Sequence, residues 1–252
     1  MDKRIISVLG LLFSVLLVHA GYVIVINPEV TQLSQQALSL GEPLPRDIFI
    51  ILKDLEQEIC LILFAWSIIL CLQKYLEISS LNYLFEVDLF EDELLDANKA
   101  VKYLSEIEKL DSEIRTSALV EILGASLRRF ALTRNIESAA SAIEPALEIM
   151  SVKNENNLSV IRYISWAIPS IGFLGTVRGI GQAMSQAKDA VGGDIGPMTS
   201  SLGVAFNSTF VALIISVILM MVLTYLQNEQ DSQLVKIKDY TERYLISRIS
   251  HD

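Results

Sequence analysis

The sequence predicts an all-α integral membrane protein with four transmembrane helices and a helical cytoplasmic domain between the second and third spans. Apolar residues make up 52% of the 252 residues, and the mean hydropathy is +0.44. These residues gather in long blocks with few charges. A helix needs about 20 mostly apolar residues to cross about 30 Å of hydrocarbon. Blocks of this kind occur four times, which is typical of a protein that spans the bilayer.

The first two blocks predict an N-terminal hairpin over residues 1–76, with spans at about 5–26 and 55–75. The first span carries no charge and follows Lys3 and Arg4. The uncharged centre of the second span is short, so its flanking Glu56, Glu58 and Lys74 are expected at the membrane interfaces. A signal peptide that ends near Ala20 is an alternative interpretation of the first span. The apolar run continues to Ile26, however, so we expect a retained span.

The last two blocks predict a second hairpin over residues 159–226. The third span covers about 159–183 and has charges only toward its ends, at Arg162 and Arg178. The fourth span covers about 198–226 and is uncharged. Basic residues are frequent in the segment between the second and third spans and scarce in the two other connections. Because cytoplasmic loops are enriched in Lys and Arg, we expect this segment and both termini in the cytoplasm.

The connecting segments give further local predictions. Asn27 to Arg46 contains prolines and reads as a short external loop. Within the cytoplasmic domain, residues 77–158, apolar residues at helical spacing predict an amphipathic helix around residues 119–130. A second helical piece is expected over 139–150, broken near Pro145, with a polar turn at 154–157. Residues 227–252 are expected to continue the fourth span as a cytoplasmic amphipathic helix.

Several classes of function are disfavoured by the composition. The net charge of −10 argues against binding to nucleic acid, which needs clustered positive charge. Cys60 and Cys71 both lie in the second span, and only two histidines occur, so we expect neither a disulfide scaffold nor a metal site. No Gly-rich phosphate loop with Lys is present. The sequence therefore predicts that the chain is not an enzyme.

Small residues form a stripe along each of the last two spans. They recur at steps of three and four, which places each stripe on one helix face. The stripe on the third span comprises Ser165, Pro169, Gly172, Thr176 and Gly179, and the stripe on the fourth comprises Ser201, Ala205, Thr209, Ala212 and Ser216. Gly175 and Gly179 add a GxxxG spacing.

Two interpretations of the stripes stay open on composition alone. Small residues let membrane helices approach closely, so the stripes can serve helix packing. Alternatively, the two faces line a narrow passage in which the threonine hydroxyls contact an ion or water.

Two segments of these spans resemble a known family. Residues 168–180, IPSIGFLGTVRGI, and residues 202–213, LGVAFNSTFVAL, are similar to the corresponding spans of the MotA/TolQ/ExbB proton-channel family. The resemblance implies a homopentamer around a dimer of a single-span partner protein that carries a membrane aspartate. It also places Thr176 and Thr209 on the ion pathway, and it matches Pro169 to the family's proline at the inner part of the helix that carries Thr176. The cytoplasmic segment does not align by eye with that of the flagellar members.

Three other sites receive specific expectations. Arg178 either reaches the headgroups, pairs with Glu56, Glu58 or Asp194, or lies at the ion entrance. His19 is expected to anchor the first span at the interface. The acidic cluster Glu91-Asp92-Glu93 is either a solvated face or a docking site for a moving partner.

Together the residues and the resemblance predict a function. The chain is expected to be the pore-forming subunit of an ion-driven motor in the bacterial inner membrane. No cofactor is expected, since the proton or sodium ion is the translocated species. The alternatives are a static membrane scaffold that recruits a partner through its cytoplasmic helices, and a subunit of a solute permease. A permease usually contains internal repeats, and none is visible in the sequence.

Overall fold

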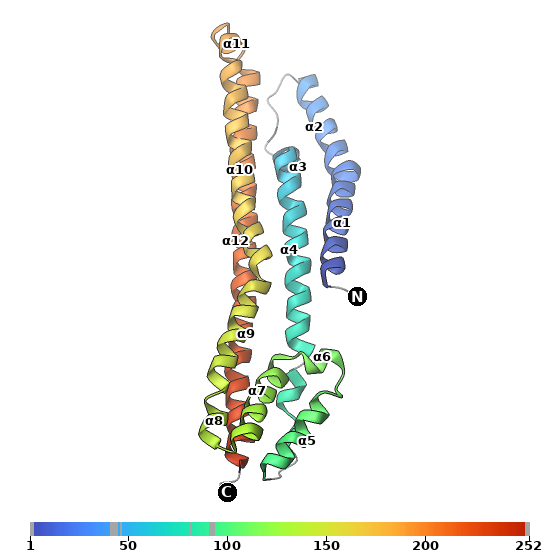
Figure 1. Ribbon diagram of the computed structural model, residues 1–252. Coiled ribbons are helices and arrows are strands. Elements are labelled where there is room, and N and C mark those ends of the chain that lie inside the picture. Colours follow the sequence, from blue (N-terminus) through green and yellow to red (C-terminus); the bar gives the residue numbers. More distant parts are fainter. Residues whose placement is uncertain (1–2, 41–44, 46, 81, 91–93, 250–252) are drawn as a thin grey trace. The chain divides into compact units, whose positions relative to one another are not determined.

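The computed structural model describes residues 3–40, 45, 47–80, 82–90 and 94–249. The chain is 88% helical, and no strand occurs in these described ranges. It divides into two compact units. Unit 1 comprises Met1–Leu72 and Val160–Thr224, and unit 2 comprises Gln73–Ser159 and Tyr225–Asp252. Figure 1 shows the helices of each unit. The predicted all-α class is confirmed.

Four helical runs of the described chain are long and apolar enough to cross a membrane. They cover Ile5–Leu40, Leu55–Phe85, Ile136–Ser185 and Gly196–Arg248. The number of spans agrees with the number of apolar blocks in the sequence. The protein is therefore a multi-pass membrane protein.

The first run of unit 1 is longer than the sequence predicted. Helix α1 (Lys3–Gly21) passes through a π-helical segment, η1 (Tyr22–Ile26), into α2 (Asn27–Leu40). The prediction of a loop from Asn27 to Arg46 is therefore wrong up to Leu40. Pro28 has no N–H and would break an α-helical hydrogen bond. The π turn just before it changes the bonding to i→i+5, as the bond from Asn27 N–H to Tyr22 O shows.

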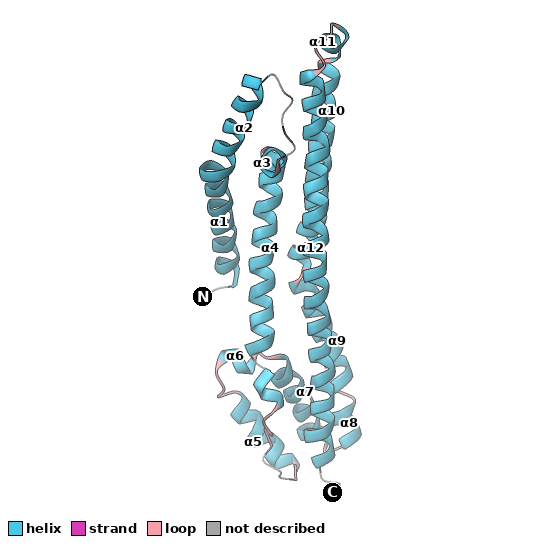
Figure 2. Ribbon diagram, turned by 180° about the vertical axis from the view of Figure 1, so that it is seen from behind, coloured by secondary structure: helices cyan, strands magenta, loops and turns pink. Residues whose placement is uncertain are grey.

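The second run of unit 1 follows a short helix, α3 (Ile48–Leu52). Asp47 caps α3, because its carboxylate accepts a hydrogen bond of 2.8 Å from the Phe49 N–H. Helix α4 (Leu55–Ser80) then begins. In both ribbon views, its part in unit 1 lies between α1 and the later spans (Figures 1 and 2).

The remaining spans of unit 1 belong to an antiparallel pair of helices. Helix α10 (Ser159–Ser185) leads through the short α11 (Ala187–Val191) to α12 (Gly196–Tyr240). Gly193 in the connection has a backbone φ of 105°, a left-handed conformation that glycine adopts without steric cost. In both views α10 and α12 run side by side (Figures 1 and 2).

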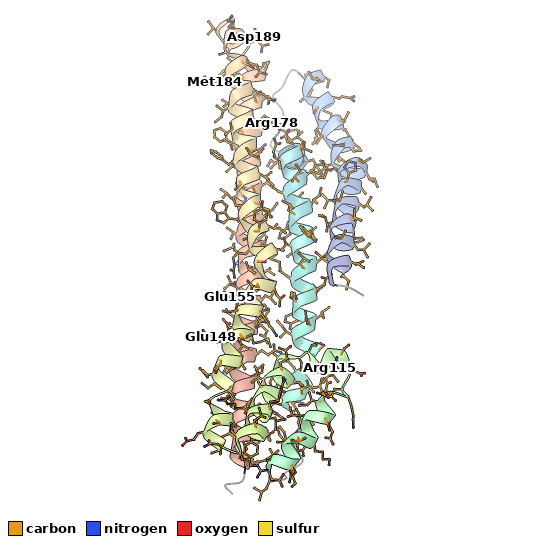
Figure 3. All side chains as sticks on the ribbon, in the orientation of Figure 1. Arg115, Glu148, Glu155, Arg178, Met184 and Asp189 are labelled. Atoms are coloured by element: carbon orange, nitrogen blue, oxygen red, sulfur yellow. The ribbon has the colours of Figure 1, made fainter. Side chains whose placement is uncertain are left out.

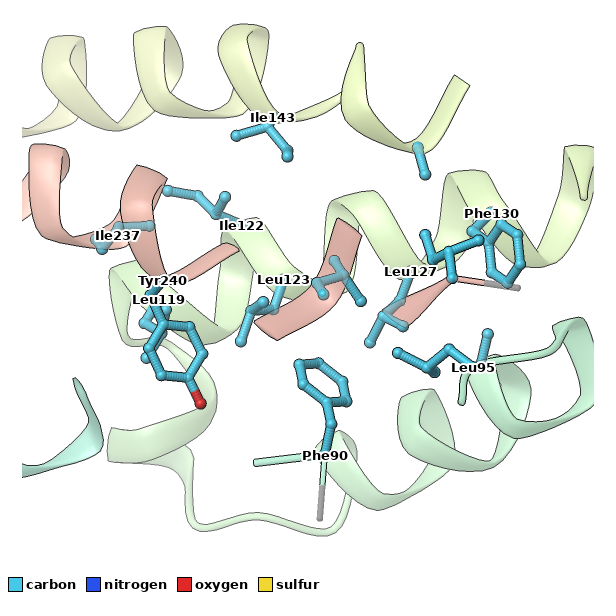
Figure 4. Packing of buried hydrophobic residues seen from close by; sticks show 14 of the residues in the cluster. Phe90, Leu95, Leu119, Ile122, Leu123, Leu127, Phe130, Ile143, Ile237 and Tyr240 are labelled. Atoms are coloured by element: carbon cyan, nitrogen blue, oxygen red, sulfur yellow. The ribbon is translucent and has the colours of Figure 1, made fainter. Parts of the chain in front are cut away.

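Unit 2 is a helical domain with its own apolar core. Its further elements are η2 (Asn82–Phe85), α5 (Ala97–Ile107), α6 (Ser112–Arg115), α7 (Ala118–Thr133), α8 (Ile136–Ala140), α9 (Ile143–Asn157), η3 (Thr241–Leu245) and η4 (Ile246–Arg248). The predicted helix around 119–130 is confirmed as α7. Its apolar residues, among them Leu123 and Leu127, are buried in the core (Figure 4).

The C-terminal end of the chain completes that core. Ile237, Tyr240 and Leu245 are buried against α7 and its neighbours (Figure 4). The Tyr240 hydroxyl donates a hydrogen bond of 2.7 Å to the Val87 carbonyl. The predicted amphipathic tail helix is thus confirmed as a helix, and its apolar face packs within the same chain.

One local prediction in unit 2 is confirmed with a small shift, and another is wrong. The break expected near Pro145 falls between α8 and α9, and Pro145 lies in the first turn of α9. Proline is tolerated there because the first N–H groups of a helix have no helical acceptor. The polar turn expected at 154–157 is the last turn of α9. The Glu91-Asp92-Glu93 cluster lies outside the described residues.

Candidate functional site

The two predicted stripes meet at the interface between α10 and α12. A Cβ atom placed on Gly179 would lie 2.7 Å from the Ala205 backbone nitrogen and 2.8 Å from the Ser201 carbonyl oxygen. A Cβ atom on Gly172 would overlap the Ala212 side chain. At both glycines a Cβ atom would come closer to α12 than van der Waals contact allows. Only glycine therefore fits at these two positions. The small faces therefore pack against one another within a single subunit.

Thr176 and Thr209 face each other in the middle of this interface, and both are partly buried. The two hydroxyls are in hydrogen-bond contact. The Thr176 hydroxyl is 2.9 Å from the Ala205 carbonyl, and the Thr209 hydroxyl is 3.1 Å from the Gly172 carbonyl. Each hydroxyl has one proton to donate and two lone pairs to accept with. The arrangement thus gathers four oxygens from two helices at one point.

Such an arrangement can exchange hydrogen bonds with water or with a proton carrier. Because each hydroxyl can rotate and act as donor or acceptor, the pair can turn toward a neighbouring ligand. It then gives up a contact to a backbone carbonyl or to its partner. The side chains are neutral, so they can line a path without trapping the ion by charge.

Pro169 and Ser165 are linked to α12 through a backbone group. Pro169 has no N–H, so the Ser165 carbonyl one turn earlier lacks its helical donor. The Ser216 hydroxyl of α12 lies 3.3 Å from that carbonyl and supplies the missing hydrogen bond. At another point of the pair, the Ser201 hydroxyl donates to Gln186 at 3.0 Å. Hydroxyls of the α12 stripe thus satisfy polar groups of α10 and of the connection that follows it.

Arg178 forms an ion pair with Glu56, one of the partners that the sequence suggested. Its guanidinium lies 2.7 Å from the Glu56 carboxylate, of whose side chain 13% is exposed (Figure 3 labels Arg178). His19 lies 2.7 Å from the Glu58 carboxylate. Helix α4 is therefore joined to α10 and to α1 by charged or polar contacts near its first turn.

Comparison with protein families supplies the decisive finding. A family model described as the MotA/TolQ/ExbB proton channel family matches residues 114–239. The chain belongs to this family. The match contains both stripes and both threonines. No curated protein and no solved structure matches the chain.

Family membership assigns the chain to a class of membrane proton channels that serve ion-driven transport and motor complexes, which is not an enzymatic class. Membership of this family also agrees with the assignment of the four apolar helical runs as membrane spans. The ion-pathway role of Thr176 and Thr209 stays a prediction, as does an ion-entrance role for Arg178. The geometry adds that all the predicted stripe residues lie on the two paired helices.

Two polar residues outside the family match were missed by the sequence reasoning. Gln57 is only 1% exposed, and its amide nitrogen lies 3.0 Å from the Ile51 carbonyl and 3.4 Å from the Ser208 hydroxyl. Asp54, three residues earlier, has a buried carboxylate oxygen. The sequence does place these two polar residues beside the charged start of an apolar span. At such a place polar residues are ordinarily interpreted as lying at the membrane interface, so their burial was not predicted.

The described residues offer no cluster of three or more His, Cys, Asp or Glu side chains that could hold a metal ion. Cys60 and Cys71 are both buried as free thiols. The polar groups described at the α10–α12 interface are hydroxyls and backbone carbonyls, and the ion pair of Arg178 with Glu56 joins α10 to α4.

Proposed function

We propose that this chain is the pore-forming subunit of an ion-driven membrane motor, in which protons or sodium ions pass the Thr176–Thr209 pair and drive movement of a partner protein. The observation that carries the proposal is the pairing of these two hydroxyls inside the segment that matches a proton channel family. A static scaffold needs close packing but has no need of hydroxyls at this point.

The distribution of acidic residues supports a partner. Helix α10 contains no Asp or Glu, and the first acidic residue of α12 is Glu229. A hydroxyl cannot hold a proton as a carboxylate does, because its pKa lies far from neutrality. We therefore propose that a partner supplies the proton carrier. The resemblance to the family implies a single-span partner with a membrane aspartate, two copies of which stand inside a ring of five copies of this chain. A neighbouring gene that encodes such a protein would support the complex.

The test compares valine and serine at the two threonines. Thr→Val keeps the shape and removes the hydroxyl, whereas Thr→Ser keeps the hydroxyl. Loss of a buried hydrogen-bond partner costs about 1–3 kcal/mol, and 1.4 kcal/mol corresponds to about tenfold in a rate. Ion flux or motor output in the host cell should fall about tenfold or more in Thr176→Val and Thr209→Val.

The serine variants are the matched controls, and we expect them to retain most of the flux. Assembly is measured on the same samples by native mass spectrometry, where the yield of pentamer should change little because packing shape is kept. A scaffold would give the opposite order, with valine tolerated and serine disturbing assembly. Full flux in both valine variants would exclude these residues from the ion path.

A further inference from the structure

Two buried acceptor atoms at the start of α4 have no donor among the residues that the structure describes. The Asp54 carbonyl accepts hydrogen bonds from the N–H groups of Gln57 at 3.1 Å and Glu58 at 3.3 Å, so Asp54 is the N-cap of the helix. Asp54 Oδ2 and Gln57 Oε1 are both buried and receive no hydrogen bond from the described residues. A buried acceptor without a donor destabilises the folded state, because it has given up its hydrogen bonds to water. Two of them within one helical turn point to a missing donor.

The orientation of the Gln57 amide is fixed by its other contacts. Its nitrogen donates to the Ile51 carbonyl at 3.0 Å, and exchanging nitrogen and oxygen would bring two acceptors together there. The Ser208 hydroxyl donates to the Val204 carbonyl at 2.9 Å, so toward Gln57 it acts as an acceptor. Gln57 Oε1 is therefore the free acceptor of this side chain.

The spacing of the two residues is that of a capping box, in which an N-cap side chain and the side chain three residues later each accept from the other's backbone N–H. In α4 the Gln57 amide nitrogen instead contacts the Ile51 carbonyl and the Ser208 hydroxyl. The Gln57 amide oxygen and the Asp54 carboxylate oxygen are left on the same turn of the helix.

The charges around Asp54 come from several elements. Lys53 and Arg178 favour its ionised form, and Glu56 opposes it. Arg178 is engaged with the Glu56 carboxylate at 2.7 Å. The charges of both Asp54 and Glu58 act on the Tyr22 hydroxyl of η1. Glu58 also contacts His19 of α1. Burial is the largest influence and raises the pKa of the Asp54 carboxyl above its ordinary value.

We propose that the Asp54 carboxyl binds a proton and donates it in a hydrogen bond to Gln57 Oε1, which makes the start of α4 a proton-loading site. One hydrogen atom then satisfies both orphaned acceptors. The proton comes from water and returns to water when the carboxyl ionises, so no other reactant takes part. Gln57 connects this site to Ser208, next to Thr209. A role in supplying the channel rests on the proposed function, whereas the binding of the proton does not.

Infrared difference spectroscopy of the purified full-length protein during an acid titration tests the proposal. An ordinary aspartate has a pKa of about 3.9, so at about pH 5.5 it is almost fully ionised. We expect the protein to retain the carbonyl band of a protonated carboxylic acid at that pH. The part of this band that comes from Asp54 should be lost in Asp54→Asn, whereas the band should be unchanged in Asp189→Asn, which removes an exposed aspartate of α11 as a matched control. In Gln57→Met the frequency of the band should change, because the acid loses its acceptor.

Thermal unfolding gives a second readout. A carboxyl whose pKa is raised by folding contributes stability that is present at low pH and is lost as the pH rises through the folded-state pKa. As the pH rises through the folded-state pKa of Asp54, the unfolding temperature should therefore fall more in the wild-type protein than in Asp54→Asn. The amide N–H of the asparagine variant can replace the acid as a donor to Gln57.

The absence of any band that depends on Asp54 at about pH 5.5 would overturn the proposal, since the carboxylate would then be ionised and a water molecule or cation would complete the site. That result would leave the channel function standing. Full ion flux in the threonine-to-valine variants would overturn the channel function and leave the proton site standing, so the two failures are distinguishable.

Discussion

Pro169 changes α10 at a single backbone hydrogen bond, and Ser216 of α12 replaces the lost donor. The Ser165 carbonyl that receives this bond is buried between the helices. In a membrane no water is available there, so the group depends on protein donors. Hydrogen bonds between membrane helices contribute about 0.6 kcal/mol on average and up to about 1.7 kcal/mol. The Pro169–Ser216 combination therefore joins the two helices at a defined point.

A double-mutant cycle measures this dependence. Ser216→Ala should lower the unfolding free energy by about 0.5–2 kcal/mol, because the Ser165 carbonyl loses its donor. In a Pro169→Ala background the same change should cost less, because the alanine introduced there supplies the helical N–H. The cycle is followed by unfolding in detergent, and Thr224→Ala serves as the control, since Thr224 donates to its own helix. Equal costs in both backgrounds would contradict the compensation.

The residues of the site differ in how far the sequence could predict them. The positions of Thr176 and Thr209 on the small-residue faces of their two helices were predictable, because steps of three and four place residues on one face of a helix. Their mutual contact, and the pairing of Arg178 with Glu56 rather than with Glu58 or Asp194, depend on the relative register of three helices. Sequence spacing does not encode that register, which follows from contacts between residues far apart in the chain.

At the scale of elements, glycines set how closely α10 and α12 approach. Gly179 lies against the backbone of α12, with the Ala205 nitrogen 2.7 Å and the Ser201 carbonyl 2.8 Å from the position of a Cβ atom. Gly181 of α10 and Gly203 of α12 have no atom within 4 Å of that position. Backbone atoms cannot rotate away as a side chain can, so a methyl group at residue 179 has to separate the helices.

We expect opposite effects from alanine at these glycines. Gly179→Ala should destabilise the protein by about 1–3 kcal/mol through overpacking. Gly181→Ala and Gly203→Ala should be neutral or stabilising by up to about 1 kcal/mol, because alanine is the better helix former. Thermal unfolding in detergent ranks the three variants. A Gly179→Ala protein as stable as the wild type would show that the close crossing of α10 and α12 is not maintained in solution.

The helices themselves were largely predictable, because long apolar blocks and the three- and four-residue spacing are local signals. The continuation of the first span into α2 was not, since Pro28 is read as a helix breaker. The π-helical segment η1 lies just before the proline and changes the backbone hydrogen bonding there. This compensation depends on a shift of backbone bonding that side-chain patterns do not reveal. Pro145 is tolerated for a different reason, because α9 begins at Ile143 and the proline lies in its first turn.

At the scale of the whole molecule, the sign of the charges gives a prediction of topology. Nine Lys and Arg residues lie in the segment from Lys74 to Lys153, whereas the connection between α10 and α12 contains only Lys188. The segment from Asn27 to Asp54 contains Arg46 and Lys53. Basic residues are retained on the cytoplasmic side during membrane insertion. We therefore expect unit 2 in the cytoplasm and the α11 connection outside the inner membrane.

Single cysteines can report this topology from both sides. Leu132 of α7 and Val191 of α11 are 83% and 90% exposed, so cysteine at either position should react readily. The native Cys60 and Cys71 are buried and are replaced by alanine in the background used. A membrane-impermeant maleimide applied to spheroplasts should label Val191→Cys at once and Leu132→Cys only after the membrane is permeabilised. Because both side chains are exposed, the difference measures sidedness rather than burial. Labelling of Leu132→Cys in sealed spheroplasts would reverse the orientation and place the basic domain outside, against the charge bias.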